Sequence, residues 1–78
     1  MPTILRLLGF RFFFYSNESK EPPHVHIEKG DAEGKYWLDP VEEEYMEGFT
    51  KSEEKQVKKI VEEQQQNFKN NWHEHFNQ

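Results

Sequence analysis

Two histidines, His24 and His26, follow a proline pair in the stretch EPPHVHIEKGD and are separated by a single residue. In an extended chain, residues i and i+2 lie on the same side, about 6.6–7 Å apart. An imidazole titrates near neutral pH, so two of them side by side can act as base and acid on one phosphodiester. This spacing makes metal-independent RNA cleavage one candidate chemistry for the chain.

The same pair could hold a metal ion with a third ligand from Glu28, from Asp31, or from one of His73 and His75. The chain has no cysteine, which excludes both a disulfide and a thiolate-bound zinc site. A His-x-His pair on an exposed strand is most often only a polar pair. Metal binding is therefore the weaker alternative, and we expect no cofactor.

Arg11 and Tyr15 belong to a second stretch with strand composition, RFFFYS. Alternation places Phe12 and Phe14 on one face of this strand and Arg11, Phe13 and Tyr15 on the other. Arg11 could stabilise developing negative charge, and Tyr15 could supply a hydroxyl donor. The pairing register decides whether these side chains share a face with the histidines, and the sequence does not fix that register.

Further strands are expected over HVHIEKG, with Val25 and Ile27 facing inward, and over KYWLD. The stretch TILRLLG is ambiguous between a short strand and a helical turn, and VEEEYMEG is a short strand or a loop. The connections between these elements are short, which favours an antiparallel meander. We therefore expect a sheet of three to four strands.

A single long helix is expected from Thr50 onward, because TKSE at residues 50–53 has the pattern of a capping box. Gln64 interrupts the apolar stripe, so a bend or a protruding end is expected there. The prediction is one α+β domain over residues 1–78, with the sheet packed against this helix. The apolar stripe consists of Val57, Ile60, Val61, Phe68, Trp72 and Phe76.

The 78 residues carry a net charge of −5, which argues against general affinity for nucleic acid, so no DNA binding is expected, although RNA stays open. Residues 30–49 hold one lysine against seven carboxylates, which most simply form a solvated edge. No window approaches 18 apolar residues, and the start lacks a basic region and a cleavage site. We expect a cytoplasmic protein with no membrane segment.

Several stretches together resemble one family of small prokaryotic proteins, catalogued as a domain of unknown function: MPTI, Gly9, YSNE, PPHVHI, GD and a charged helix ending in NW. The resemblance runs from Met1 to about Trp72, and its specific part is the Pro-Pro-His-x-His element. It implies a gene pair that looks like a toxin–antitoxin module, an intracellular protein partner and a toxin role.

By analogy with that family, His24 and His26 are the first functional candidates, with Tyr15 and Asn17 behind them. The chain departs from the family pattern in a longer turn, SNESKEPP, and in Ser19, where many members carry a histidine. A three-histidine site is correspondingly less expected here.

The leading expectation is a component of a toxin–antitoxin-like module. It would be a toxin acting on RNA through His24 and His26 as acid and base, with Arg11 stabilising charge. The alternative is a non-catalytic interaction domain that binds a partner through its sheet edge or through the aromatic helix end at Trp72 and Phe76. A homo-oligomer is compatible with either.

Overall fold

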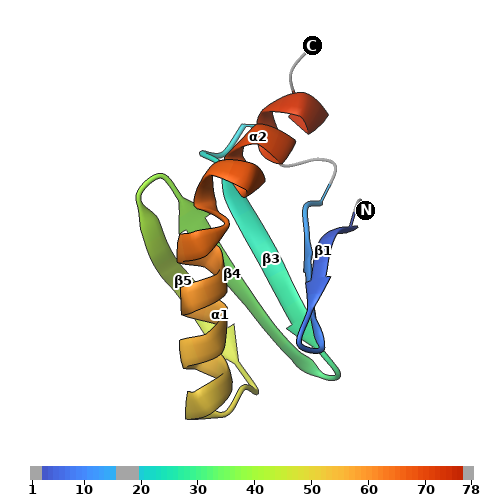
Figure 1. Cartoon of the computed structure of the whole chain (residues 1–78), viewed down its shortest axis with the longest axis vertical. Helices are drawn as coiled ribbons and strands as arrows, with labels where there is room; N and C mark the ends of the chain where they lie inside the picture. The colour runs from blue at the N-terminus through green and yellow to red at the C-terminus, as the bar shows by residue number, and fades with distance from the viewer. Residues whose placement is uncertain (1–2, 16–19, 77–78) are drawn as a thin grey trace.

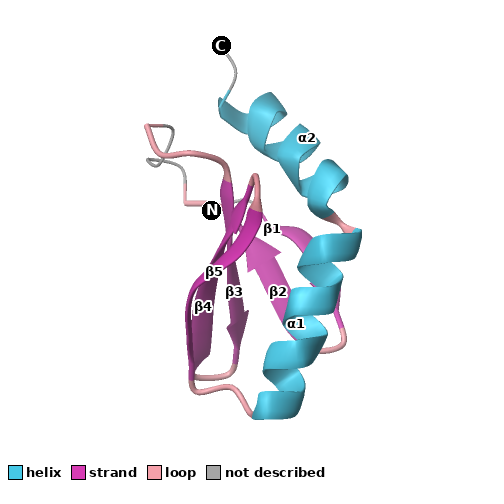
Figure 2. Ribbon diagram, turned by 90° about the vertical axis from the view of Figure 1, so that its left-hand side faces the viewer, coloured by secondary structure: helices cyan, strands magenta, loops and turns pink. Residues whose placement is uncertain are grey.

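The computed structural model describes residues 3–15 and 20–76, and within them five strands precede two helices (Figure 1). The strands follow one another in sequence order in a single antiparallel sheet. Both helices pack on the same face of that sheet (Figure 2). The elements are β1 (Thr3–Leu7), β2 (Phe10–Phe13), β3 (His24–Lys29), β4 (Ala32–Leu38), β5 (Val41–Glu47), α1 (Lys51–Glu63) and α2 (Gln65–Phe76).

The prediction of three to four strands against one long helix is wrong, because the described residues form five strands and two helices. The ambiguous TILRL segment is strand β1. It returns along β2 through a two-residue turn in which Leu8 (φ 55°) and Gly9 (φ 85°) both have positive φ, as type I′ hairpins require. The acidic segment is strand β5, which pairs with β4 along its whole length.

The expected long helix ends at Gln64 (φ −100°, ψ 9°), and a second helix starts at the next residue. A long-range hydrogen bond holds the break in place: the side-chain amide of Gln65 donates to the carbonyl oxygen of Leu38, 2.7 Å away. This hydrogen bond ties the junction to the end of β4. The helix start agrees with the prediction, because Thr50 and Glu53 form the reciprocal bonds of a capping box.

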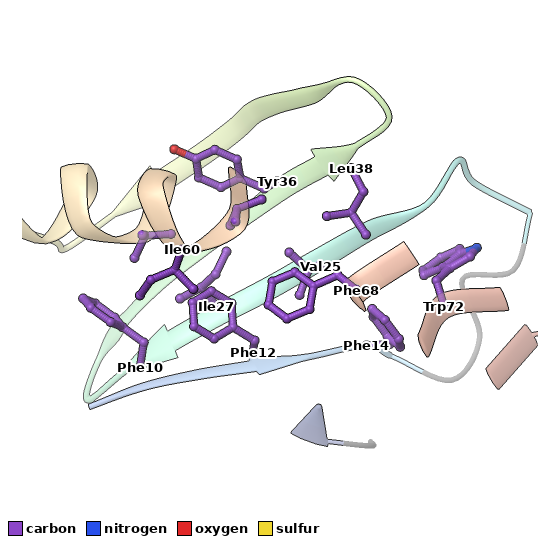
Figure 3. Packing of buried hydrophobic residues seen from close by; sticks show 12 residues of the cluster. Phe10, Phe12, Phe14, Val25, Ile27, Tyr36, Leu38, Ile60, Phe68 and Trp72 are labelled. Atoms are coloured by element: carbon purple, nitrogen blue, oxygen red, sulfur yellow. The ribbon is translucent and has the colours of Figure 1, made fainter. Parts of the chain in front are cut away.

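The core lies between the helices and one face of the sheet and is rich in aromatic rings (Figure 3). Phe12 packs on Phe68 of α2, with ring centroids 5.4 Å apart, and Phe14 meets Trp72 edge to face at 5.2 Å. Trp72 is therefore a core residue, as its place in the apolar stripe predicts. The cluster consists of Phe10, Phe12, Phe14, Val25, Ile27, Tyr36, Leu38, Val57, Ile60, Val61, Phe68 and Trp72.

We call the sheet face turned away from α1 and α2 the open face. The register places Arg11 opposite Glu28, Phe13 opposite His26, and His26 opposite Lys35. These residues alternate with core residues along their strands, so they belong to the open face. At 13 and 12 residues, α1 and α2 are each too short to cross a membrane, and no other helix occurs in the described parts of the chain.

Candidate functional site on the open sheet face

The register brings all four predicted site residues to one region of the open face. Arg11 and Tyr15 come from β2 and the residues just after it, and His24 and His26 come from β3. Their side chains join a continuous layer of rings, which we call the aromatic layer. It consists of Phe13, Tyr15, His24, His26 and Trp37.

His26 is the centre of the aromatic layer. Its ring stacks on Phe13 at 5.6 Å and meets Tyr15 edge to face at 4.6 Å, measured between centroids. His24 lies 5.1 Å away along the strand, in a T-shaped arrangement. Only 6% of His26 is exposed. The alternation predicts that His26 faces outward, as a functional residue or as an exposed polar one, and the structure instead buries its ring among other rings.

His24 is fully buried and bridges the two faces of the sheet at the start of β3. Its ring contacts Trp37 of the open face at 5.5 Å and Trp72 of α2 at 4.8 Å. Its Nδ1 lies 2.9 Å from the carbonyl oxygen of Pro22. A carbonyl oxygen can only accept, so Nδ1 must carry the proton and donate it.

Arg11 is held by its neighbours rather than aimed at the histidines. Its Nη1 lies 2.7 Å from Glu28 Oε1, and its Nε donates to Thr3 Oγ1 at 2.7 Å. The guanidinium also lies 4.3 Å above the ring of Phe13. The arrangement anchors Arg11 at the β1–β2 side of the aromatic layer.

Lys35 holds the matching position on the other side of the aromatic layer. Its ammonium group lies 4.4 Å above the Trp37 ring and 2.8 Å from Glu21 Oε1. Glu21 precedes β3, so this contact holds the residues just before His24 against the open face. Both cations that flank the layer are therefore paired with a carboxylate.

This geometry bears directly on the predicted chemistry. An acid and a base must each come within hydrogen-bond distance of the reacting atoms. His24 is fully buried and only 6% of His26 is exposed, so little of either ring faces solvent in this arrangement. Among the described residues, no three His, Asp or Glu side chains converge as metal ligands. Asn17 and Ser19 lie outside the described residues.

A hollow of about 220 Å³ opens beside Trp37. It is lined by Pro22, Trp37, Asp39, Pro40 and Glu42. The indole Nε1 of Trp37 donates to Glu44 at 2.8 Å, which fixes the ring as one wall. Lys69 is 3.4 Å from Asp39, whereas none of the ion pairs of the described residues involves Glu42. The hollow combines an aromatic wall with a carboxylate that no cation of the described residues pairs.

Sequence reasoning did not assign Trp37 or Glu42 to the site. The alternation in KYWLD carried the signal for Trp37, because Tyr36 and Leu38 are buried and Lys35 and Trp37 must then face the other way. The run of carboxylates around Glu42 predicts a solvated edge and gives no signal for a site. Its position opposite Trp37 follows from the β4–β5 register, which contains an irregularity between Lys35 and Tyr36.

Comparison with known proteins gives one match. A family model described as a domain of unknown function, DUF4160, matches residues 9–73, which include all four predicted site residues. Comparisons with curated proteins and with solved structures gave no match.

Proposed function

We propose that this chain, which belongs to the DUF4160 family of unknown function, is the protein-binding component of a cytoplasmic, toxin–antitoxin-like pair. Its partner would be the product of a neighbouring gene, and it would bind on the open face of the sheet. The observation that carries the proposal is the hollow beside Trp37, where an aromatic wall lies next to the carboxylate of Glu42, which forms no ion pair with another described residue.

The hollow suits a basic side chain of the partner. A lysine or arginine can lay its apolar stem against Trp37 and the prolines while its charge meets Glu42. Tryptophan, tyrosine and arginine dominate the energetically important positions of protein interfaces, and Trp37, Tyr15 and Arg11 all belong to this face. The chain's net charge of −5 also favours a basic partner.

The buried histidines support binding rather than catalysis. Their rings pack against Phe13, Trp37 and Trp72, which gives the face a rigid shape. A pre-organised surface loses little conformational entropy on binding. RNA cleavage by His24 and His26 would instead require the fully buried ring of His24 to become accessible to the substrate.

Binding of the purified chain to the purified product of the adjacent gene, measured by calorimetry, tests the proposal. We expect Glu42→Lys to weaken binding at least tenfold, or about 1.4 kcal/mol, because it places a cation in the hollow. Glu63→Lys, the same charge change on an exposed position of α1, is the control. Equal affinity of the two variants would contradict the proposal, as would no binding by the native chain.

Growth of bacteria after induction of the chain alone tests the catalytic alternative. Arrest with degraded RNA would favour a toxin acting on RNA, provided that His26→Gln, expressed to the same level and folded, abolishes both effects. Normal growth and intact RNA are expected if the chain acts by binding its partner.

A further inference from the structure

A row of charged residues crosses the open face of the sheet from one edge to the other. The pairing register places each residue of the row directly opposite the next, and the irregularities of the β1–β2 and β4–β5 pairs fall outside it. We call this set the charged row. In the order β1 to β5, with one residue from each strand, it consists of Arg6, Arg11, Glu28, Glu33 and Glu47.

The charges of this row are segregated rather than alternating. The residues on β1 and β2 are cations, and those on β3, β4 and β5 are carboxylates. Only the β2–β3 pair therefore joins opposite charges, and every other cross-strand pair of the row joins like charges. Directly opposite residues in antiparallel strands have Cα atoms about 4.5–5.5 Å apart, and like charges at such positions destabilise a sheet. The charged row therefore lowers the stability of the isolated chain.

The two ends of the row carry charge that the described residues do not neutralise. Arg11 lies 2.7 Å from Glu28, whereas none of the ion pairs of the described residues involves Arg6, Glu33 or Glu47. These last three side chains are exposed, and both helices lie on the other face of the sheet (Figure 2). A cation is thus presented at the β1 edge of the open face and carboxylates are presented at the β5 edge.

We propose that the partner protein lies across the charged row in one orientation, with basic side chains over Glu33 and Glu47 and a carboxylate beside Arg6. This inference rests on the proposed function, because it concerns the same partner and the same face. A cation between Glu33 and Glu47 attracts both carboxylates and offsets their mutual repulsion. Four strand spacings make the row about 20 Å long, so the partner presents a strip of that length, basic at one end and acidic at the other.

The hollow beside Trp37 agrees with this orientation. Glu42 lines that hollow and belongs to β5, as Glu47 does. A basic side chain in the hollow and one over Glu47 therefore come from the same side of the partner. Both contacts place the basic part of the partner at the β5 edge, which leaves its acidic part for the β1 edge.

Two other occupants fit the row less well. The phosphates of an RNA would meet three carboxylates of the row and only two cations, one of which is already paired with Glu28. A second copy of this chain, stacked face to face about a twofold axis along β3, would place Glu28 against its own equivalent. Each copy also has a net charge of −5. A protein partner with separated charges avoids both conflicts.

An exchange of the charges at the two ends of the row tests the proposal. The double variant Arg6→Glu/Glu47→Lys keeps the net charge of −5 but reverses the sign at each end. Calorimetry should show that it binds the purified product of the adjacent gene at least tenfold more weakly than the native chain. The control is Lys59→Glu/Glu63→Lys, which exchanges charges at exposed positions of α1 and should bind like the native chain. Native affinity of the row variant would overturn the proposal.

Urea denaturation of the same variant shows that weaker binding is not a loss of fold. The exchange places opposite charges on β1 and β2 and on β4 and β5, so the urea midpoint should rise above that of the native chain. A midpoint below the native value would overturn the like-charge arrangement on which the proposal depends.

The charged row and the proposed function can fail separately. If Glu42→Lys weakens binding and the row variant binds like the native chain, the charged row is overturned and the proposed function stands. If the native chain does not bind the adjacent gene product, both are overturned. Sedimentation, and titration with a single-stranded RNA, identify the other occupants. Self-association or RNA binding that the row variant abolishes would overturn the proposed partner.

Discussion

The imidazole of His24 packs against the indole of Trp72, with ring centroids 4.8 Å apart, although the two residues belong to the first strand after the proline pair and to the last helix. The contact joins the open face to the helix layer at one end of the molecule. It makes His24 a structural residue whatever else it does, since a fully buried ring in a small core contributes substantially to stability.

Replacement of His24 by alanine should lower the free energy of unfolding by about 2–4 kcal/mol, because it leaves a cavity and removes the hydrogen bond to Pro22. Urea denaturation followed by tryptophan fluorescence measures this. His73→Ala on the exposed side of α2 should change stability by no more than about 0.5 kcal/mol. Equal effects of the two substitutions would show that the ring packing contributes little.

The ion pair between Arg11 and Glu28 should stabilise the fold modestly. A double-mutant cycle with Arg11→Gln and Glu28→Gln is expected to give about 0.5–1 kcal/mol, because Glu28 is partly exposed and solvent screens the pair. The stability of the single variants and the double variant, measured at low and high salt, provides the value. Salt should reduce the coupling, and a coupling that is zero at low salt would contradict the bonded geometry.

The start of α1 should become less stable in acid. Hydrogen bonds to Lys29 and to the Thr50 backbone N–H hold the pKa of Glu53 below its usual value. Stability from this group is present at neutral pH and is lost as the pH falls through the lowered pKa.

Glu53→Gln keeps a capping side chain without a titrating one, so its unfolding free energy should fall less between neutral and acid pH. Glu63→Gln, at an exposed position of the same helix, should behave like the native chain. The Glu53 prediction fails if the two variants show the same acid dependence.

Tyr36 should make the protein sensitive to alkali. Burial, and then the neighbouring carboxylate of Glu43, raise the pKa of the phenol to about 12. Since the folded pKa lies above the unfolded one, the stabilisation is complete below about pH 10 and is lost as the pH rises toward 12.

Over that interval Tyr36→Phe should lose about 1–3 kcal/mol less stability than the native chain. Thermal unfolding at a series of alkaline pH values measures the stability of both proteins. Lysine titration affects the two proteins equally, so its contribution cancels in the difference between them. Parallel curves for the two proteins would contradict the raised pKa.

The local sequence pattern by itself predicts several features of the structure. The alternation in HVHIEKG separates Val25 and Ile27, which are buried in the core, from His24 and His26. The Thr50–Glu53 capping box and the apolar stripe locate the helix start and its buried face. These features follow from sequence because they depend on residues at most a few positions apart, where strand and helix periodicity act directly.

Pairing between segments far apart in the sequence decided which side chains lie together, where the helices break and which residues are buried. The β2–β3 register placed Arg11 opposite Glu28, and the β4–β5 register placed Glu42 opposite Trp37. The bond from Gln65 to Leu38, 27 residues away in the chain, fixed the break between the helices. The burial of both histidines likewise depends on rings from other elements. The alternation of residues along a strand predicts which face of the sheet a side chain occupies. Whether that side chain is exposed depends on the residues that other elements place on the same face, and only the tertiary structure specifies this.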